Sequence, residues 1–438
     1  MANEWSNKSL DALGRIVTGK TPPLTVADAF GGSIPFITPS DMDGTRIISA
    51  AARTLSATGQ TAVKNAVIPK NAVMVSCIGS DMGKAAIAGA NCITNQQINS
   101  IVIDTDDSPL FVYYNLSTRK SEIRGAASGS AQPILNKSAF GRLEIELPPP
   151  EEQRAIAHIL GTLDDKIELN RKQNKTLEAI VRALFKAWFV DFEPVRAKME
   201  GRWRRDQSLP GLPKQLYDIF PGQLIESEFG EIPEGWVPDQ LATFTSIKNG
   251  YAFKSKDWRD CGVPVVKIGS VKPRFVDLRQ ASFIEDSLSQ EKSQFRLSAG
   301  DMLVGLTGYV GETGRVPVVD VFPMLNQRVG KFEPKAEFAP FVFACVRAAE
   351  FKAFAESKAH GSAQPNVSTA DLLTYPVINP GKNILAEFCN IIGPIFDQQL
   401  RCESESRSMA QLRDTLLPKL ISGDLRVPDA EKIVGAMA

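Results

Sequence analysis

Few stretches of this 438-residue sequence place side chains at a spacing that catalysis requires. The run Gly79–Ala85 (GSDMGKA) comes nearest to a phosphate-binding loop, but it is one residue too short and lacks a Ser or Thr after the lysine. A simple turn after a strand is the favoured interpretation. Glu333-Pro334-Lys335 has an acid–x–Lys order, yet no suitable acid pair precedes it, and no Asn-Pro-Pro-aromatic methyltransferase motif is present. The sequence therefore predicts no catalytic residue.

Cysteine and histidine give no metal site either. The six cysteines are scattered without a CxxC pair, and His158 and His360 have no ligand-like neighbours. We expect reduced thiols, no metal and no cofactor. The N-terminus lacks a signal-peptide pattern and no apolar run is long enough to cross a membrane, which predicts a cytoplasmic protein.

Charge is balanced, with 50 basic and 50 acidic residues. The chain therefore has no global basic field, and a nucleic-acid role would need local patches or a partner that carries the charge. The length exceeds one typical domain, so two or more domains are expected.

The second half of the sequence repeats the first. Trp5, Leu10, Gly19 and Asn95-Gln96 recur 231 positions later, and Gly-Ser-Ala-Gln-Pro at 129–133 recurs letter for letter at 361–365. Collinear markers at one nearly constant offset indicate a single unit present twice. The period is too long for a solenoid, so each unit should be a domain with an appendage.

That appendage is a long helix, predicted at 151–190 and again at 381–426. The first copy follows three prolines, and its apolar residues alternate at steps of four and three, as in a coiled-coil seam. At about 1.5 Å per residue it would span about 60 Å. Asn170 and Asn174 make the middle of the seam polar, and the second copy is also polar in its middle. Pro394 should kink that copy or mark its true start. The seam residues predicted to pair the helices are Ile156, Leu160, Leu163, Ile167, Asn170, Asn174, Leu177, Val181, Leu184, Ile392, Ile395, Met409, Leu416 and Leu420.

The expected fold is α+β, with two tandem α/β domains, each followed by a long helix, and the helices paired as an antiparallel coiled coil with pseudo-two-fold symmetry. The predicted strands are 34–38, 72–78, 98–103, 143–147, 263–268, 301–306, 316–319 and 330–332, and the predicted helical stretches within the domains are 111–125 and 338–358. The expected segments are a domain at 1–150, a helix at 151–190, a surface connector at 191–235, a domain at 236–380, a helix at 381–426 and a tail at 427–438.

A set of short motifs keeps a recognisable order along the chain. They are EEQRAIA at 151–157, LDDKI at 163–167, DFEPV at 191–195, GEIPEGW at 230–236, the paired GSAQP segments and LLPKLISG at 416–423. In these motifs the chain resembles, over nearly its whole length, the specificity subunits of type I restriction–modification systems. One departure is that the second helix begins KNILAE at 382–387 instead of with the EEQR motif.

The resemblance implies that each domain is a target recognition domain that reads one half of a split, asymmetric DNA site. It implies that the paired helices set the gap between the half-sites and dock two methyltransferase subunits, through which restriction/translocase subunits join. It also implies that the chain itself is not catalytic. Two alternatives stay open: a protein-interaction scaffold without DNA readout, and an orphan subunit of a methyltransferase-only system.

Residues that read bases should recur at matching repeat positions but differ in identity, because the half-sites differ. Asn95-Gln96-Gln97 and Asn326-Gln327-Arg328 fit this pattern, since Gln favours adenine and Arg favours guanine in bidentate contacts. The competing interpretation is a structural turn whose side chains bond the backbone. The full set of DNA-binding candidates is Lys20, Lys84, Gln96, Gln97, Gln132, Lys254, Lys256, Arg274, Arg315, Gln327, Arg328 and Gln364.

The outer face of the first helix is the expected partner-binding surface. Its candidate residues are Glu151, Glu152, Arg154, Asp164 and Asp165, although a solvated helix face is the favoured interpretation of the last two. The basic cluster at Arg202, Arg204 and Arg205 could bind DNA or a partner, or merely solubilise the connector.

Overall fold

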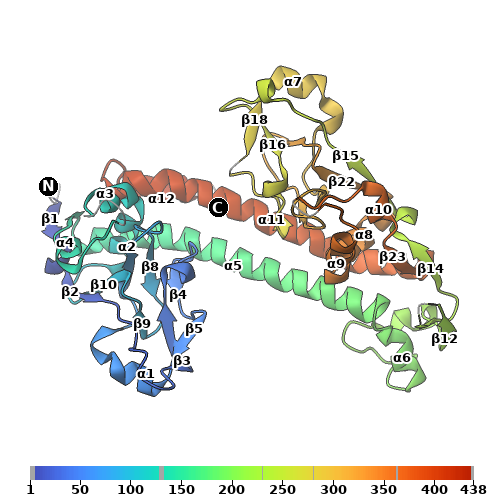
Figure 1. Cartoon of the computed structure of the whole chain (residues 1–438), viewed down its shortest axis with the longest axis horizontal. Coiled ribbons are helices and arrows are strands. Elements are labelled where there is room, and N and C mark those ends of the chain that lie inside the picture. Colours follow the sequence, from blue (N-terminus) through green and yellow to red (C-terminus); the bar gives the residue numbers. More distant parts are fainter. Residues whose placement is uncertain (1–4, 128–132, 229, 280, 362–363, 436–438) are drawn as a thin grey trace. The chain divides into compact units, whose positions relative to one another are not determined.

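The computed structural model describes residues 5–127, 133–228, 230–279, 281–361 and 364–435, which form two compact units (Figure 1). Unit 1 comprises Met1–Glu168 and Ser408–Ala438, and unit 2 comprises Leu169–Arg407. This division differs from the linear one expected from the sequence. Each long helix contributes one part to unit 1 and the other part to unit 2, so contacts do not follow chain order.

Unit 1 is built on two mixed sheets. The five-stranded sheet has the order β2 (Gly14–Thr18), β10 (Ile98–Ile103), β7 (Val73–Ser76), β8 (Ala85–Ala88) and β4 (Ile47–Ile48). The four-stranded sheet has the order β5 (Arg53–Leu55), β3 (Phe30–Ile37), β9 (Cys92–Thr94) and β6 (Val67–Ile68). A further pair joins β1 (Ser6–Ser9) to β11 (Glu144–Leu147). The short helices are α1 (Ala57–Ala62), α2 (Pro109–Thr118), α3 (Lys120–Gly125) and α4 (Lys137–Gly141).

Unit 2 repeats this topology. Its five-stranded sheet has the order β15 (Thr245–Asn249), β22 (Val329–Pro334), β19 (Met302–Gly305), β20 (Thr313–Arg315) and β17 (Arg274–Phe275). A three-stranded sheet holds β18 (Ser282–Ile284), β16 (Val263–Val266) and β21 (Met324–Leu325), and β14 (Val237–Gln240) pairs with β23 (Pro376–Asn379). The short helices are α7 (Asp286–Glu291), α8 (Ala339–Val346), α9 (Ala349–Ser357) and α10 (Thr369–Leu373). The five-stranded sheets match strand for strand, as the sequence repeat requires.

One strand prediction is wrong. Residues 316–319 form no strand, and the ladder partner of β19 is β20, which ends at Arg315. Pro317 follows within two residues and has no N–H to donate, so the ladder cannot continue through it. The other predicted strands overlap observed ones, because their apolar residues fill the sheet cores.

The two long helices are α5 (Pro150–Phe189) and α11 (Lys382–Ile421), and within each unit the parts of the two helices that belong to it run side by side in opposite directions (Figure 1). The predicted antiparallel pairing is therefore confirmed. Pro394 does not mark the start of α11, which begins upstream at Lys382. A proline removes the donor to the carbonyl four residues earlier, and that residue, Asn390, is exposed to water.

Polar side chains cross the middle of the helix pair within unit 2. Asn170 and Asn174 are buried, and Asn170 Nδ2 donates to Glu405 Oε2 at 3.0 Å. Gln399 Nε2 donates to Glu178 Oε2 at 3.3 Å. These bonds can form in one register only, so they oppose sliding of one helix along the other. The buried apolar seam residues are Ile156, Leu160, Leu163, Ile167, Leu416 and Leu420 in unit 1 and Val181 and Ile392 in unit 2, whereas Leu177, Leu184, Ile395 and Met409 are half-buried.

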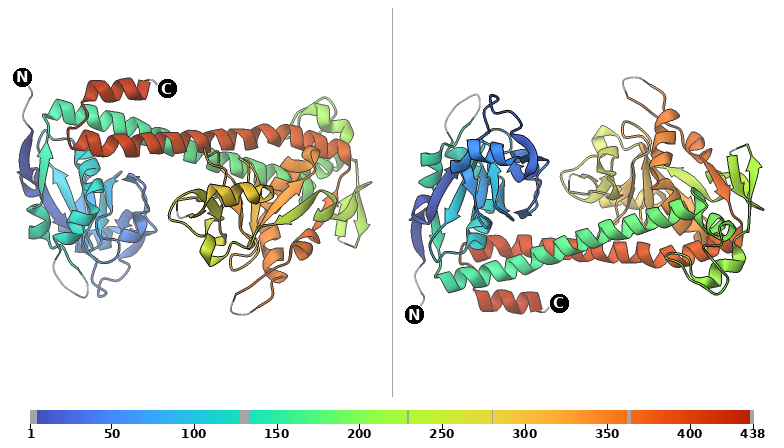
Figure 2. Two further views of the ribbon diagram at one scale, coloured as in Figure 1. Left: turned by 90° about the horizontal axis from the view of Figure 1, so that it is seen from above. Right: turned by 90° about the horizontal axis from the view of Figure 1, so that it is seen from below.

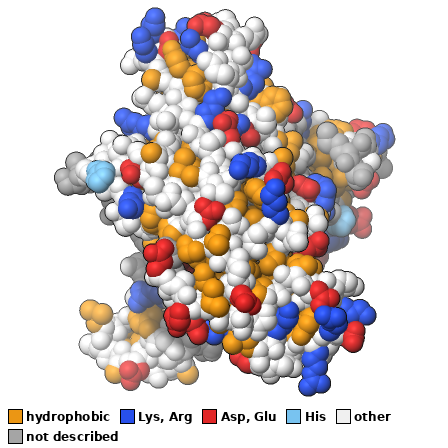
Figure 3. Space-filling model, turned by 90° about the vertical axis from the view of Figure 1, so that its right-hand side faces the viewer, with side chains coloured by type: hydrophobic (Ala, Val, Ile, Leu, Met, Phe, Trp, Pro, Cys, Tyr) orange, Lys and Arg blue, Asp and Glu red, His pale blue; other side chains and the backbone are white. Residues whose placement is uncertain are grey.

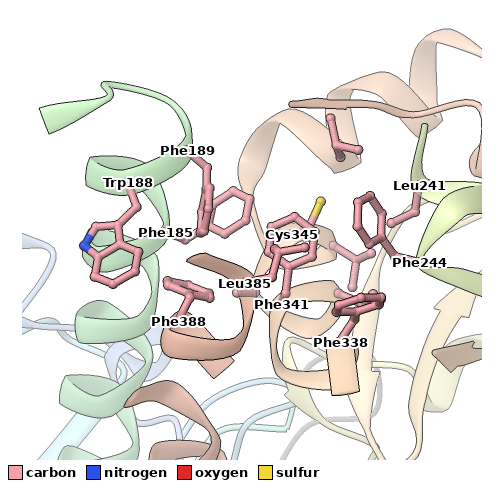
Figure 4. Packing of buried hydrophobic residues seen from close by; sticks show 14 of the residues in the cluster. Phe185, Trp188, Phe189, Leu241, Phe244, Phe338, Phe341, Cys345, Leu385 and Phe388 are labelled. Atoms are coloured by element: carbon pink, nitrogen blue, oxygen red, sulfur yellow. The ribbon is translucent and has the colours of Figure 1, made fainter. Parts of the chain in front are cut away.

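An aromatic core joins the helices to the sheet domain of unit 2 (Figure 4). Phe189 from the end of α5 packs 4.7 Å from Phe388 of α11 and 5.2 Å from Phe341 of α8, between ring centroids. Cys345 lies in the same cluster, and burial raises the pKa of its thiol to about 12. The sheet domain of unit 2 is thus fused to the helix pair by burial of large rings.

The segment expected as a surface connector is folded. It contains α6 (Glu193–Met199) and the hairpin of β12 (Leu224–Ser227) and β13 (Gly230–Pro233), and Trp203 is only 1% exposed. The expected tail is also folded, because α12 (Val427–Gly435) packs Ala430 into the core of unit 1 beside the end of α11 (Figure 2). In the described part of the chain, no helix is long and apolar enough to span a bilayer.

Candidate nucleic-acid interface

The Asn-Gln-Gln segment of unit 1 is a tight turn between β9 and β10. Asn95 Oδ1 accepts a hydrogen bond from the backbone N of Gln97 at 3.1 Å, and Asn95 Nδ2 donates to Gln97 Oε1 at 2.9 Å. Gly19 passes directly beneath, and a β-carbon there would lie 2.0 Å from Asn95 O. Only glycine permits this approach.

Unit 2 builds the same turn between β21 and β22. Asn326 Oδ1 accepts from the backbone N of Arg328 at 3.3 Å, and a β-carbon on Gly250 would lie 2.3 Å from Asn326 O. The repeated asparagine and glycine therefore hold the backbone in both units, as the structural interpretation of the Asn-Gln pair proposed. We call these two segments, residues 95–97 and 326–328, the repeat turns.

The side chains after the asparagine differ between the repeat turns. In unit 1 Gln96 Oε1 accepts from Thr21 Oγ1 at 2.7 Å, and Gln97 is held by Asn95. In unit 2 Gln327 and Arg328 are exposed, and neither side chain makes a hydrogen bond or ion pair with any residue that the structure describes. One backbone frame thus presents two different sets of polar side chains.

A strand end connects each repeat turn to the residues that follow the Gly-Ser-Ala-Gln-Pro motif. In unit 1 Cys77 N donates to Gln97 O at 2.7 Å, and Leu135 N donates to Cys77 O at 2.9 Å. In unit 2 Leu306 N donates to Arg328 O at 3.0 Å, and Val367 N donates to Leu306 O at 2.9 Å. Gln132 lies outside the described residues, and Gln364 is exposed.

The basic candidates other than Arg315 and Arg328 fall into two environments. Lys20, Lys254, Lys256 and Arg274 are exposed, and Lys84 is half-buried beside Asp81 at 2.9 Å. On the face seen in Figure 3, Lys and Arg side chains are interspersed with Asp and Glu. The exposed cations can approach phosphates, whereas the charge of Lys84 is already partly neutralised.

Arg315 departs from its predicted role. It is 7% exposed, and its Nη1 donates to the backbone O of Phe396 on α11 at 2.9 Å. Burial lowers the pKa of its guanidinium to about 10. A side chain so enclosed cannot reach a phosphate, and it ties β20 to α11 instead.

The arginines of the connector are mostly engaged. Arg202 pairs with Glu193 at 2.8 Å and with Glu200 at 2.5 Å, and Arg205 pairs with Asp218 at 2.7 Å. Because acidic partners offset these charges, the cluster is locally balanced and offers little net attraction to phosphates.

The partner-binding candidates on α5 also differ in whether they are exposed or already paired. Glu151 and Arg154 are exposed, and Glu152 pairs with Arg426 at 3.3 Å. Asp164 departs from the expectation of an outer-face residue, because Tyr114 Oη and Arg413 Nη1 each donate to it at 2.6 Å and its side chain is 11% exposed. Asp165 is exposed but pairs with Arg46 of the sheet domain. The two aspartates therefore hold unit 1 together.

Gln153 of the EEQR motif has a role that the sequence did not single out. It is fully buried, its Nε2 donates to Asp107 Oδ1 at 2.7 Å, and its Oε1 accepts from Ser108 N at 2.9 Å. Burial raises the pKa of Asp107, but hydrogen bonds from Gln153, Thr105 and Lys8 outweigh it and leave the pKa below its ordinary value. This glutamine docks the start of α5 on α2, and its central place in the motif was the only sequence signal.

A second interaction that the sequence did not reveal joins the sheet domain of unit 2 to α5. Arg347, after α8, donates from Nε and Nη2 to Glu178 Oε1 of α5 at 2.9 and 2.8 Å. Arg347 Nη1 also donates to Thr313 O at 2.8 Å. The two residues are far apart in sequence, so no local pattern could have paired them.

Comparison with known proteins gives one consistent family. Residues 2–179 and 233–400 match the model described as the type I restriction modification DNA specificity domain. The type I restriction enzyme MjaIX specificity subunit of Methanocaldococcus jannaschii is 25% identical, over 97% of this chain and 94% of its own length. The HindI specificity subunit of Haemophilus influenzae is also 25% identical, over 72% and 76% respectively. The crystal structure of an S subunit from M. genitalium shares the fold, with a TM-score of 0.56 and 16% identity over 95% of this chain and 96% of that one.

Proposed function

Because the chain belongs to the type I restriction–modification DNA specificity family, we propose that it confers DNA sequence specificity on a restriction–modification complex. Unit 1 and unit 2 each read one half of a two-part, asymmetric site. The chain has no catalytic role, and methyltransferase subunits, expected to number two, supply the chemistry. Restriction/translocase subunits join through them.

The observation that carries this proposal is the pair of repeat turns. Both use the same asparagine and the same close glycine to fix the backbone, yet one ends in Gln97 and the other in Arg328. A protein that recognises two different half-sites needs the same backbone conformation in both units and different side chains at the positions that contact the bases. Glutamine matches adenine and arginine matches guanine in the major groove.

The helices supply the second part of the proposal. Glu151 and Arg154 remain exposed at the start of α5, where acidic residues also suit the positive end of the helix dipole. The equivalent start of α11 has Lys382 and Asn383 instead. We propose that methyltransferase subunits dock at these helix ends and that the two docking contacts are unequal.

Selection from a randomised duplex pool tests the function. The full-length chain, assembled with its methyltransferase, should enrich a two-part motif with a fixed gap. A scaffold without readout would enrich nothing, and that result would reject the proposal.

Replacing Arg328 with Ala tests the repeat turn of unit 2. We expect preference at one base pair of a single half-site to fall by about 1–3 kcal/mol, with the other half-site unchanged. Arg205→Ala, which removes an exposed arginine of the connector, is the matched control. If Arg328→Ala weakened binding to cognate and random DNA equally, Arg328 would be a phosphate contact and the base-reading role would fail.

A further inference from the structure

Four arginines of unit 2 surround one carboxyl group of α11, that of Glu403. They are Arg171 of α5, Arg274 of β17, Arg279 in the segment before β18, and Arg407 of α11. Burial raises the pKa of Glu403 above its ordinary value, although the positive charges of all four arginines act to lower it. We call these four residues the arginine cluster.

The register of the helix pair explains why two of these arginines meet. Gln399 of α11 donates to Glu178 of α5 at 3.3 Å, and the two helices run in opposite directions within unit 2. Arg171 lies about two turns before Glu178, and Arg407 lies about two turns after Gln399, so both arginines come to the same level of the helix pair. Glu403 precedes Arg407 by four residues, which is one turn on the same face. Like charges at one level repel each other, and one carboxylate can offset only one of them.

The sheet domain of unit 2 supplies the other two arginines. Arg274 lines a small hollow together with Gln399, which lies one turn before Glu403 on α11. Arg279 follows in the same segment of the sheet domain and pairs with Asp277 at 2.7 Å. The cluster is therefore assembled from three separate elements, all of them in unit 2.

The arginine cluster carries an excess of positive charge. Four guanidinium groups face two carboxylates, those of Glu403 and Asp277, which leaves a net charge of about +2. Arg171 and Arg274 are exposed and Arg407 is half-buried, and none of the three forms a hydrogen bond or a close ion pair with any residue that the structure describes. The whole chain has no net charge, so this is a local patch of the kind that nucleic-acid binding requires.

Unit 1 uses its corresponding arginine differently. Strand β4 takes the place of β17 in the sheet order, and Arg46, just before it, donates to Tyr114 Oη at 3.1 Å and pairs with Asp165 of α5. Arg46 thus holds the sheet domain of unit 1 to its helix. Arg274 has no such partner, so its guanidinium is available to an anion from outside the chain.

Phosphate is the anion that fits this arrangement. Guanidinium groups bind phosphate oxygens through two parallel hydrogen bonds, and several of them suit a row of phosphates. Under the proposed function the helices separate the two half-sites, and duplex DNA between them carries one negative charge for about every 1.7 Å of its length.

Building on the proposed function, we propose that the arginine cluster binds backbone phosphates of the DNA that lies between the two half-sites. Arg171 and Arg407 of the helix pair and Arg274 of the sheet domain bond the phosphate oxygens, and Glu403 limits the repulsion among them when DNA is absent. Phosphate contacts carry no sequence information, so the cluster adds affinity and fixes the position of the DNA along the helix pair.

A methylphosphonate scan of the selected duplex tests this proposal. Each phosphate between the half-sites is replaced in turn by an uncharged methylphosphonate, and the affinity of the full-length chain with its methyltransferase is measured at about 50 mM salt. At one or more positions the affinity of the native chain should fall about threefold or more. The double variant Arg171→Ala/Arg407→Ala should bind more weakly and should no longer respond at those positions. A phosphate held by the methyltransferase would give the same loss in both chains, so this coupling separates the two sources.

Three further measurements sharpen the test. Raising the salt from about 50 to about 200 mM should weaken the native chain about threefold more than the double variant for each phosphate contact removed. Glu403→Gln removes the central negative charge and should tighten binding to cognate and random DNA alike. Arg401→Ala, which removes an exposed arginine of the same helix that is bonded to Gln398, is the matched control and should behave like the native chain.

Several results would overturn the proposal. One is a double variant that keeps the native response to methylphosphonate. Another is a double variant that loses affinity for the methyltransferase without DNA, because the cluster would then be a protein contact. A lowered urea midpoint of the double variant would make the arginines structural partners of Glu403. If a two-part site is selected and no coupling is found, only this proposal fails; if no site is selected, the proposed function fails with it.

Discussion

Replacing Glu178 with Ala should destabilise unit 2 severely. Glu178 is the only carboxylate within ion-pair distance of Arg347 among the described residues, and Arg347 is 8% exposed. The variant leaves a buried guanidinium with the carbonyl of Thr313 but without a negative charge. It also removes the acceptor of Gln399, so the polar middle of the helix pair loses a bond.

The expected loss in the free energy of unfolding is about 3–5 kcal/mol, the range for breaking a buried ion pair from one side. The retained bond to Thr313 places the expectation at the lower end. Asp191→Ala is the matched control, because Asp191 forms an exposed ion pair with Lys186 of the same helix. An exposed pair contributes about 0–1 kcal/mol.

The same pair predicts a pH dependence. Burial raises the pKa of Glu178, but Arg347, Arg182 and Gln399 outweigh burial and leave its pKa below the ordinary 4.5. A carboxylate whose folded pKa is depressed stabilises the fold above its unfolded pKa, and this contribution is lost as pH falls through the folded value. The stability difference between the native chain and Glu178→Gln should therefore shrink as pH falls below 4.5.

Tryptophan fluorescence during urea unfolding provides the assay. Four of the five tryptophans, at positions 188, 203, 236 and 258, belong to unit 2, so the signal reports mainly on that unit. The midpoint should fall for Glu178→Ala at an unchanged slope. If Glu178→Ala and Asp191→Ala cost the same, the buried pair would not be what fixes the sheet domain of unit 2 to α5.

Two further predictions concern local packing. Gly250→Ala places a β-carbon 2.3 Å from Asn326 O and should displace the repeat turn, weakening readout of one half-site in the duplex selection, whereas Gly269→Ala, with open space around it, should behave like the native chain. Alkylation followed by mass spectrometry should modify the exposed Cys261 rapidly at neutral pH. Cys77 and Cys92, whose pKa values burial raises to about 11 and about 12, should react only after unfolding; early modification of either would contradict their burial.

The sequence by itself determined the repeat, the two long helices and the class of protein. These features depend on local periodicity and on identities at a constant offset, such as Trp5 with Trp236. Both can be recognised without knowledge of tertiary contacts. The sequence also located the repeat turns, because an asparagine that recurs in both units and is followed by different side chains can be identified without a structure. It erred at residues 316–319, where apolar composition alone suggested a strand that Pro317 does not allow.

Only the tertiary structure decided which side chains are available. Arg315 and Asp164 look like surface charges in sequence, but packing against the other elements buries them in ion and hydrogen-bond networks. The division into units also depends on contacts, since α5 and α11 each serve both. Burial and long-range pairing, as between Glu178 and Arg347, arise when segments distant in the chain come into contact, and no local sequence pattern shows which segments will do so.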